Sequence, residues 1–420
     1  MNEMLLKRMA IQSVAFMLLI ITISYALRRY QSITIEASNK KINSTDESLT
    51  FDTSSSSDCT DNASKSSKGD ICPGFHGIME AVDQNIIAQM SNRYLIIKKP
   101  EGDSIELRME DLYVTKSIRI VLTGLSRDEI SSAFIARVNK NEIFTGEPIF
   151  TEVAADNMNT VENTLGTEIT KDYGNDIVHS ITIHTAYDEL HNDYAAELLL
   201  ELDNVYAHIL QEDSNYYYID LRNPSDVYDK ILVIDAGHGG KDAGALSKNE
   251  KYYERDMNLD ILLQLKELLD QENIKVYYTR LSDEAVFLRP RVTLANAVNC
   301  DFFISIHCNA STAAEPNGTE VLYYDREFEG VKSKDLAQVC LDELAKNIPI
   351  RKQGLVEKKE NEIFILKKAT VPAIIIEVGY MTNNNDMEFL SSPANRKAAA
   401  EGIYHGIMAA YKTLRTEDQH

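Results

Sequence analysis

The part of the chain that begins at about residue 230 alternates apolar runs of strand length with helical stripes. Residues 231–235 and 301–307 have the pattern of buried strands, and residues 255–270 between them place leucine and isoleucine on one helical face. Further strands are expected at 274–279, 319–324, 363–366 and 373–377, and further helices at 289–298, 331–347 and 394–414. This alternation predicts an α/β domain with a mainly parallel central sheet and helices on both faces.

The preceding residues, from about 77 to 229, favour strands. Apolar and aromatic residues recur at period two, or cluster as β-formers, in 117–124, 180–185, 205–210 and 216–221. Helices are expected only around 78–90 and 195–202. We therefore predict a small β-rich domain over 77–229. Its three consecutive tyrosines, 216–218, fit a carbohydrate-stacking surface or, more commonly, packing within a sheet.

The N-terminal residues contain two segments that do not fit a packed core. Residues 9–27 carry no charged side chain, and at about 1.5 Å per residue they approach the ~30 Å thickness of a bilayer core. Residues 1–30 are therefore predicted to hold a transmembrane helix, retained as an anchor in preference to a cleaved signal segment. Residues 31–76 are predicted to be a disordered, Ser/Asp-rich tether, because they have too few large apolar residues to offset the entropy lost on ordering.

Charge and cysteine content exclude some classes of protein. The 420 residues carry a formal net charge of -22 at pH 7, whereas a nucleic-acid-binding protein needs a basic face, so nucleic acid is not expected as a partner. The five cysteines form no CxxC pair. Cys300, Cys308 and Cys340 are expected to be small buried apolar residues.

The first strand of the α/β domain leads into VIDAGHGGKDAG, residues 233–244. A P-loop would need glycine where Asp235 stands and serine or threonine where Asp242 stands. A dinucleotide-binding fingerprint would need its third glycine at Asp242. This stretch instead delivers His238 from a strand end into a glycine-lined space, which fits either a metal ligand or a locally hydrogen-bonded turn histidine.

Four polar side chains are expected to meet beyond the carboxyl ends of the strands, where ligand sites of parallel sheets lie. His238, His307 and Glu377 follow or end strands, and Glu254 begins the helix after the first strand. Two histidines and a carboxylate form a catalytic zinc set that leaves one position for water. Simpler interpretations exist for Glu254, which suits any helix N-terminus, and for His307, which suits a hydrogen-bonded core. A carboxylate as deep as Glu377 is costly unless it is paired or protonated.

Residues 231–414 resemble the catalytic domain of the zinc-dependent N-acetylmuramoyl-L-alanine amidases, the Amidase_3 family. The resemblance rests on DAGHGGKDAG at 235–244, ERDMNL at 254–259, TRLSD at 279–283, Arg291 with Ala295 and Asn296, FISIHCNAS at 303–311 and IEVGYMTN at 376–383. It implies a catalytic domain over 230–415 in which His238, Glu254 and His307 bind Zn²⁺ and Glu377 is the catalytic glutamate. The implied reaction is hydrolysis, by zinc-activated water, of the amide between N-acetylmuramic acid and the L-alanine of the peptidoglycan stem peptide.

The resemblance also suggests roles for flanking residues and domains. Lys241, Asp242, Arg280 and Arg291 are candidates for substrate contact or site support, with scaffold salt bridges as the alternative. The β-rich domain loosely resembles the wall-targeting module called AMIN in position and strand content. Together with the N-terminal helix, these features predict a protein at the extracytoplasmic face of the bacterial membrane, anchored there or secreted if the segment is cleaved. Its expected partners are peptidoglycan and the membrane, and the need for a protein activator stays open.

Two other functions stay open at this point. A zinc metallopeptidase that cuts bonds within the stem peptide could use the same ligand set, because the His-Glu-His order does not specify the bond. A non-catalytic wall-binding protein with a relic hydrolase domain is the other alternative. Retention of all three expected ligands and of Glu377 argues against that second alternative.

Overall fold

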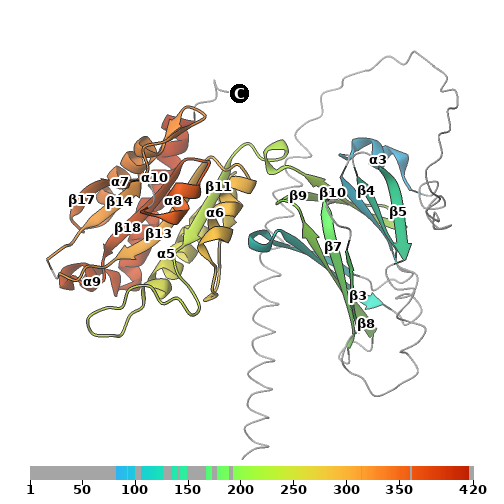
Figure 1. The fold of residues 1–420 in the computed structure, drawn as a ribbon, viewed down its shortest axis with the longest axis horizontal. Helices are drawn as coiled ribbons and strands as arrows, with labels where there is room; N and C mark the ends of the chain where they lie inside the picture. Colours follow the sequence, from blue (N-terminus) through green and yellow to red (C-terminus); the bar gives the residue numbers. More distant parts are fainter. Residues whose placement is uncertain are drawn as a thin grey trace, which may run out of the picture. The chain divides into compact units, whose positions relative to one another are not determined.

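The computed structural model describes residues 82–91, 93–99, 106–125, 134–139, 142–148, 167–172, 177–188, 193–313, 315–359 and 362–415. The predicted N-terminal membrane helix and the Ser/Asp-rich tether lie outside these residues. Within the described ranges, no helix has the length and apolar character needed to cross a membrane. Regular structure falls into a β-rich part and an α/β part (Figure 1), and each is described by itself.

The β-rich part consists of two antiparallel five-stranded sheets, with strand orders β5-β4-β1-β10-β9 and β2-β3-β8-β7-β6. Apolar residues of both sheets form one buried cluster, which includes Leu95 and Ile219 from one sheet and Ile120 and Leu198 from the other. The strands are β1 (Tyr94–Lys98), β2 (Glu106–Leu112), β3 (Ser117–Leu125), β4 (Phe134–Asn139), β5 (Glu142–Pro148), β6 (Thr167–Asp172), β7 (Val178–Asp188), β8 (Asp193–Leu202), β9 (Ala207–Glu212) and β10 (Tyr216–Arg222). Short helices are α3 (Gln84–Gln89), η1 (Tyr113–Thr115) and η2 (Pro224–Asp226).

In the β-rich part, one predicted helix is wrong, and the structure decides between the two interpretations of the three consecutive tyrosines. The helix expected at 195–202 is part of strand β8, because its buried residues recur at every second position and pair with strands on both sides. The helix expected around 78–90 is confirmed only over α3. Tyr216, Tyr217 and Tyr218 are 6%, 7% and 0% exposed, so these tyrosines pack inside the domain and offer no stacking surface.

The α/β part is built on one six-stranded sheet of order β12-β11-β13-β18-β14-β17. Strands β12, β11, β13 and β18 are parallel, whereas β14 runs antiparallel to β18 and parallel to β17. The sheet is therefore mixed, and the predicted parallel order holds over four neighbouring strands. The strands are β11 (Ile231–Ala236), β12 (Lys275–Tyr278), β13 (Phe302–Asn309), β14 (Thr319–Tyr323), β17 (Lys352–Glu357) and β18 (Ala373–Tyr380), and β15 (Glu327–Phe328) and β16 (Val331–Lys332) form a separate hairpin.

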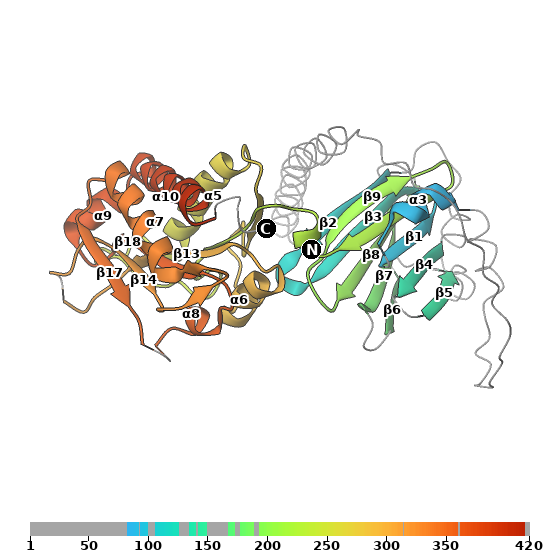
Figure 2. The ribbon, with the colours of Figure 1, turned by 90° about the horizontal axis from the view of Figure 1, so that it is seen from above.

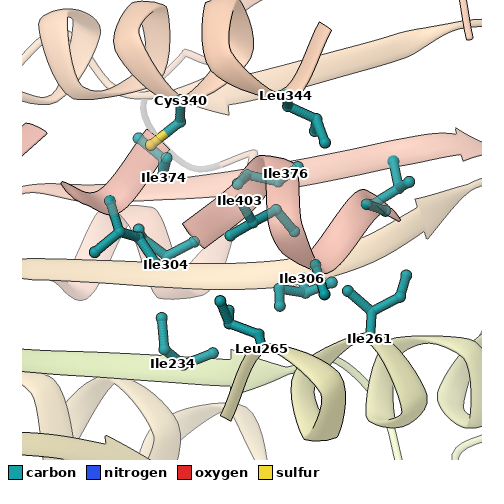
Figure 3. Packing of buried hydrophobic residues seen from close by; sticks show 14 of the residues in the cluster. Ile234, Ile261, Leu265, Ile304, Ile306, Cys340, Leu344, Ile374, Ile376 and Ile403 are labelled. Carbon is teal, nitrogen blue, oxygen red and sulfur yellow. The ribbon is translucent and has the colours of Figure 1, made fainter. Parts of the chain in front are cut away.

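Helices cover both faces of this sheet (Figure 2), as the alternation predicted. The helices are α5 (Glu254–Leu269), α6 (Leu288–Ala297), α7 (Ser333–Asn347), α8 (Phe364–Lys368), α9 (Asn384–Leu390) and α10 (Pro393–Leu414). Alternate residues of β13 face opposite layers: Ile304 packs with α5, α7 and α10, and Phe303 packs with α6 and α8. Figure 3 shows the first of these layers, where Ile304 and Ile376 of the sheet meet Leu265 and Ile403 of the helices. Cys300, Cys308 and Cys340 are buried free thiols, as predicted.

The strand expected at 363–366 is also wrong. Those residues enter helix α8, where backbone N–H groups of Lys367 and Ala369 donate to carbonyls four residues earlier. A short apolar run does not distinguish a strand from one buried helical turn. Strand β17 of this sheet was not predicted, because it lies at the sheet edge and all its residues are exposed or half-buried.

Candidate metal centre

His238 lies just beyond the end of β11 on a left-handed stretch of backbone. Its φ is 63°, and Gly239 and Gly240 follow with φ of 132° and 57°. A β-carbon at Gly239 would lie 2.2 Å from the carbonyl oxygen of Glu284, and one at Gly240 would lie 2.7 Å from the amide nitrogen of Ala285. The glycines therefore let the chain turn in a space too small for a side chain. His238, the candidate ligand, is the non-glycine residue that adopts a strained, left-handed conformation in this turn.

Two buried arginines hold this strained turn. Arg280 donates to the carbonyl oxygens of Ala236 and Gly237 at 2.9 and 3.0 Å. Arg291 donates to the carbonyl oxygens of Ala236 and His238 at 2.6 and 2.7 Å. Both arginines are only 2% exposed. Of the two roles considered for them, this geometry favours support of the His238 turn over contact with a substrate.

Asp235 forms an ion pair with one of these arginines, Arg291. Its Oδ1 lies 2.5 Å from Nη1 of Arg291 and accepts a hydrogen bond from Thr279, while its Oδ2 accepts one from Ser305. Burial alone would raise the pKa of Asp235, but the Arg291 guanidinium and the two hydroxyl donors hold that pKa below its usual value. The turn thus rests on a satisfied, buried ion pair.

The structure brings His238, Glu254 and His307 together. One potential ligand atom from each lies within 4.8 Å of the others. Nε2 of His238 is 3.2 Å from Oε2 of Glu254, and Nδ1 of His307 is 2.9 Å from Oε1 of the same carboxylate. Ligands at about 2.0–2.2 Å from a tetrahedral ion lie roughly 3.4 Å apart, close to these two contacts, so the three side chains could close around a zinc ion.

Further partners orient His238 and Glu254. Nδ1 of His238 lies 2.9 Å from Oδ2 of Asp242. Glu254 accepts hydrogen bonds from the backbone N–H groups of Ala245 at 2.8 Å and Cys308 at 3.2 Å. Burial would raise the pKa of Glu254, but its contacts with the two histidines hold that pKa well below its usual value. Such outer partners fix the ring and carboxylate orientations that a metal needs.

Glu377 completes the group from β18, where it pairs directly with His307 of β13. Burial raises the pKa of Glu377 to about 7, a shift that His307 opposes and the charges of Glu254 and Glu320 increase. Its Oε2 is buried and has no hydrogen-bond partner among the described residues. A buried carboxylate oxygen without a partner, on the strand next to the candidate ligands, marks a place for water or substrate.

The remaining candidate, Lys241, is exposed on the turn after His238 and makes no hydrogen bond or ion pair with any residue that the structure describes.

Two residues that contribute to the site, Asn258 and Glu320, were not predicted from the sequence. Asn258 donates to the Gly237 carbonyl at 3.2 Å and to Oε1 of Glu254 at 3.4 Å. Its position four residues after Glu254, on the same helix face, was the available signal. Glu320 lies next to Glu377 only through strand register, which no local pattern reveals.

Comparison with known proteins identifies the family of the α/β part. Residues 232–409 match the family model described as N-acetylmuramoyl-L-alanine amidase. The chain is 31% identical over 193 residues to the germination-specific N-acetylmuramoyl-L-alanine amidase of Bacillus subtilis, a match that covers 43% of this chain and 78% of that protein. It is 32% identical over 182 residues to the uncharacterized protein YqiI of the same organism, covering 43% of this chain and 85% of that protein.

Other matches also fall on the α/β part. The match to the amidase LytC of Bacillus subtilis, 31% over 192 residues, spans 46% of this chain but only 37% of that longer relative. The solved catalytic domain of CwlV, an amidase from Bacillus (Paenibacillus) polymyxa var. colistinus, is 33% identical with a TM-score of 0.41, covering 44% of this chain and 98% of that domain. The family predicted from the motifs is confirmed: this chain belongs to the N-acetylmuramoyl-L-alanine amidases, a family of peptidoglycan amidases.

Proposed function

We propose that the chain is a zinc-dependent amidase in which His238, Glu254 and His307 hold Zn²⁺ and Glu377 carries the proton. The observation that supports this most directly is the convergence of three ligand atoms within 4.8 Å, beside a carboxylate oxygen that has no partner. The bond cleaved is the amide between the lactyl group of N-acetylmuramic acid and the L-alanine of the stem peptide.

The donor set selects the kind of metal. Two imidazoles and one carboxylate in a compact group suit zinc, whereas calcium and magnesium prefer oxygen-only sites. Asp242 accepts a hydrogen bond from Nδ1–H of His238, so Nε2, which lies 3.2 Å from Oε2 of Glu254, is the ring atom that would bind the metal. When bound, zinc supplies a Lewis acid for the scissile carbonyl and lowers the pKa of water to about 7.

Glu377 is suited to both halves of the proton transfer. Burial raises the pKa of this carboxyl group toward neutrality, which suits a group that accepts a proton from water and then releases it. The water oxygen forms the new C–O bond, the C–N bond breaks, and Glu377 delivers the water's proton to the departing nitrogen. The unpartnered Oε2 is the atom we assign to this transfer.

The other predicted residues have supporting roles in this proposal. Asp242 orients His238, while Arg280 and Arg291 hold the carbonyls of the turn that carries it. Gly237 leaves room for the candidate zinc ligand His307, because a β-carbon at position 237 would lie 2.2 Å from the His307 imidazole. Lys241, exposed beside the site, is proposed to contact the anionic substrate.

The location of the enzyme is part of the proposal. Its substrate lies outside the bacterial membrane, and the uncharged segment at residues 9–27 has the length to anchor the chain at that face. The β-rich domain is proposed to bind the wall near the bond to be cut. The acidic charge of the chain gives no reason to include nucleic acid among the partners.

The test is mass spectrometry of purified peptidoglycan digested with the full-length chain. We expect release of stem peptides with a free N-terminal L-alanine, loss of that release on zinc chelation, and recovery on zinc addition. Glu377→Ala is expected to bind zinc normally and release none. Fragments cut within the stem peptide would instead establish the metallopeptidase alternative, and a zinc-loaded chain that binds peptidoglycan without cutting it would establish the wall-binding alternative.

A further inference from the structure

Glu320 extends the row of functional side chains to the next strand. In β14, which is antiparallel to β18, Glu320 pairs directly with Glu377. On the other side of β18, Glu377 pairs directly with His307 of β13. Directly paired residues share one face of a sheet, and in an antiparallel pair such as Glu320 and Glu377 the β-carbons are about 4.5–5.5 Å apart. His307, Glu377 and Glu320 therefore form a row across three neighbouring strands, with Glu320 on the side away from the candidate metal ligands.

Glu320 is held in place by hydrogen bonds and pairs with no basic side chain among the described residues. The Tyr380 hydroxyl donates to its Oε1 at 2.7 Å, and Nδ2 of Asn309 lies 3.5 Å from its Oε2. Burial and the neighbouring Glu320 raise the pKa of Tyr380, so this phenol keeps its proton and remains a hydrogen-bond donor. None of the ion pairs among the described residues includes Glu320. Glu320 and Glu377 thus lie side by side, and no Lys or Arg side chain among the described residues pairs with either, an arrangement that favours a ligand bringing N–H donors or positive charge.

Hydrolysis of the proposed substrate produces such a group. The C–N bond to L-alanine breaks, and the water oxygen bonds to the lactyl carbonyl carbon. One water proton reaches the nitrogen through Glu377, which gives an amine and a carboxylic acid. At neutral pH the acid gives up its proton and the amine takes one, so the products are a carboxylate and an alanine ammonium group.

The order of His307, Glu377 and Glu320 across the three strands indicates where the leaving nitrogen would lie. The substrate carbonyl has to approach the metal ligands, and the leaving nitrogen has to approach Glu377, which delivers the proton. The next side chain along the row is Glu320. We propose that Glu320 binds the leaving nitrogen of the stem peptide and accepts a hydrogen bond from it as it becomes an ammonium group. This inference rests on the proposed amidase function, and within it Tyr380 is a positioning residue.

Two soluble substrates with the same lactyl carbonyl test the inference in the full-length, zinc-loaded chain. One is a muramoyl dipeptide with the natural amide, and the other is its ester analogue, in which oxygen replaces the leaving nitrogen. Glu320→Gln keeps the size of the side chain and an acceptor for Tyr380. We expect it to lower kcat/KM for the amide at least about tenfold, the effect of losing one charge-assisted hydrogen bond, and to leave the ester within about threefold. Tyr380→Phe should also lower kcat/KM for the amide and not for the ester, but by a smaller factor. Glu327→Gln, at an exposed position, should leave kcat/KM unchanged for both substrates.

Product binding supplies a readout that does not depend on turnover of the variant. A free L-alanyl-D-glutamate peptide should inhibit the wild-type chain, and Glu320→Gln should raise its inhibition constant about tenfold. The N-acetylated peptide, which has no ammonium group, should inhibit both proteins equally. An equal loss on amide and ester, with unchanged product inhibition, would overturn the role of Glu320 alone. A wild-type chain that fails on the amide would overturn the proposed function and this inference with it.

Discussion

The carboxylate of Glu254 contacts both histidines of the site, with one oxygen directed at each. Oε1 lies 2.9 Å from Nδ1 of His307, a residue 53 positions away, and Oε2 lies 3.2 Å from Nε2 of His238. Burial would lower the pKa of His238, but its contacts with Glu254 and Asp242 raise that pKa to about 9. The three side chains thus face one shared position, and a metal ion that binds there would displace the proton that Glu254 and Asp242 stabilise on His238.

We expect Glu254→Gln to abolish tight zinc binding. The amide has the same size but no charge, and it cannot present two equivalent oxygens to the histidines. Zinc affinity measured by competition with a chelating dye should fall at least about hundredfold, while the circular dichroism spectrum stays unchanged. Glu267→Gln, on the exposed face of the same helix, is the matched control and should bind zinc like the wild type. Equal zinc affinity in both variants would show that Glu254 is not a ligand.

Asp242→Asn tests the orientation of His238. The carboxylate lies 2.9 Å from Nδ1 of His238, and its loss should allow the ring to rotate and to change tautomer. Zinc affinity should fall about 10- to 100-fold, with activity restored at high zinc concentration. Asp325→Asn, on an exposed position, provides the control. Activity that stays low under saturating zinc would assign Asp242 to substrate contact instead.

Asp235→Asn is expected to destabilise the α/β part and to change its dependence on pH. The pKa of Asp235 is lowered in the folded state, so its ionised form stabilises the fold above the ordinary aspartate pKa of about 4, and this contribution is lost as pH falls through the folded value. The variant leaves Arg291 buried without its partner, which should cost about 3–5 kcal/mol at pH 7. In urea denaturation, the difference in free energy of unfolding between the wild type and the variant should become smaller below about pH 4. An equal difference at pH 7 and pH 3 would contradict the role of the charge.

Gly406→Ala tests the contact between α10 and α7. A β-carbon at Gly406 would lie 2.9 Å from the α-carbon of Cys340, so the helices would have to separate. Although alanine is the better helix former, we expect a loss of about 1–3 kcal/mol in the free energy of unfolding by urea. His405→Ala, one position away and exposed, should be neutral or slightly stabilising. A gain in stability at Gly406 would mean that the two helices tolerate a larger separation.

The sequence by itself determined the class of the α/β part and the family. Local periodicity was enough for the class, because a buried strand and a helix packed on a sheet must place apolar residues at periods of 2 and 3.6. The family followed from the resemblance carried by motifs such as DAGHGGKDAG at 235–244 and IEVGYMTN at 376–383. It also determined where His238, Glu254, His307 and Glu377 lie along their strands and helix, since strand ends and helix starts are local features.

Only the tertiary structure decided what depends on partners distant in the chain. Residues 195–202 form a strand because β3 and β7 pair with them, whatever their helix propensity. Strand β14 is antiparallel to β18, and that register alone places Glu320 beside Glu377. The support of the His238 turn by Arg280 and Arg291 likewise joins residues more than 40 positions apart. Pairing and buried hydrogen bonds of this kind depend on non-local neighbours, and no local pattern of residues encodes them.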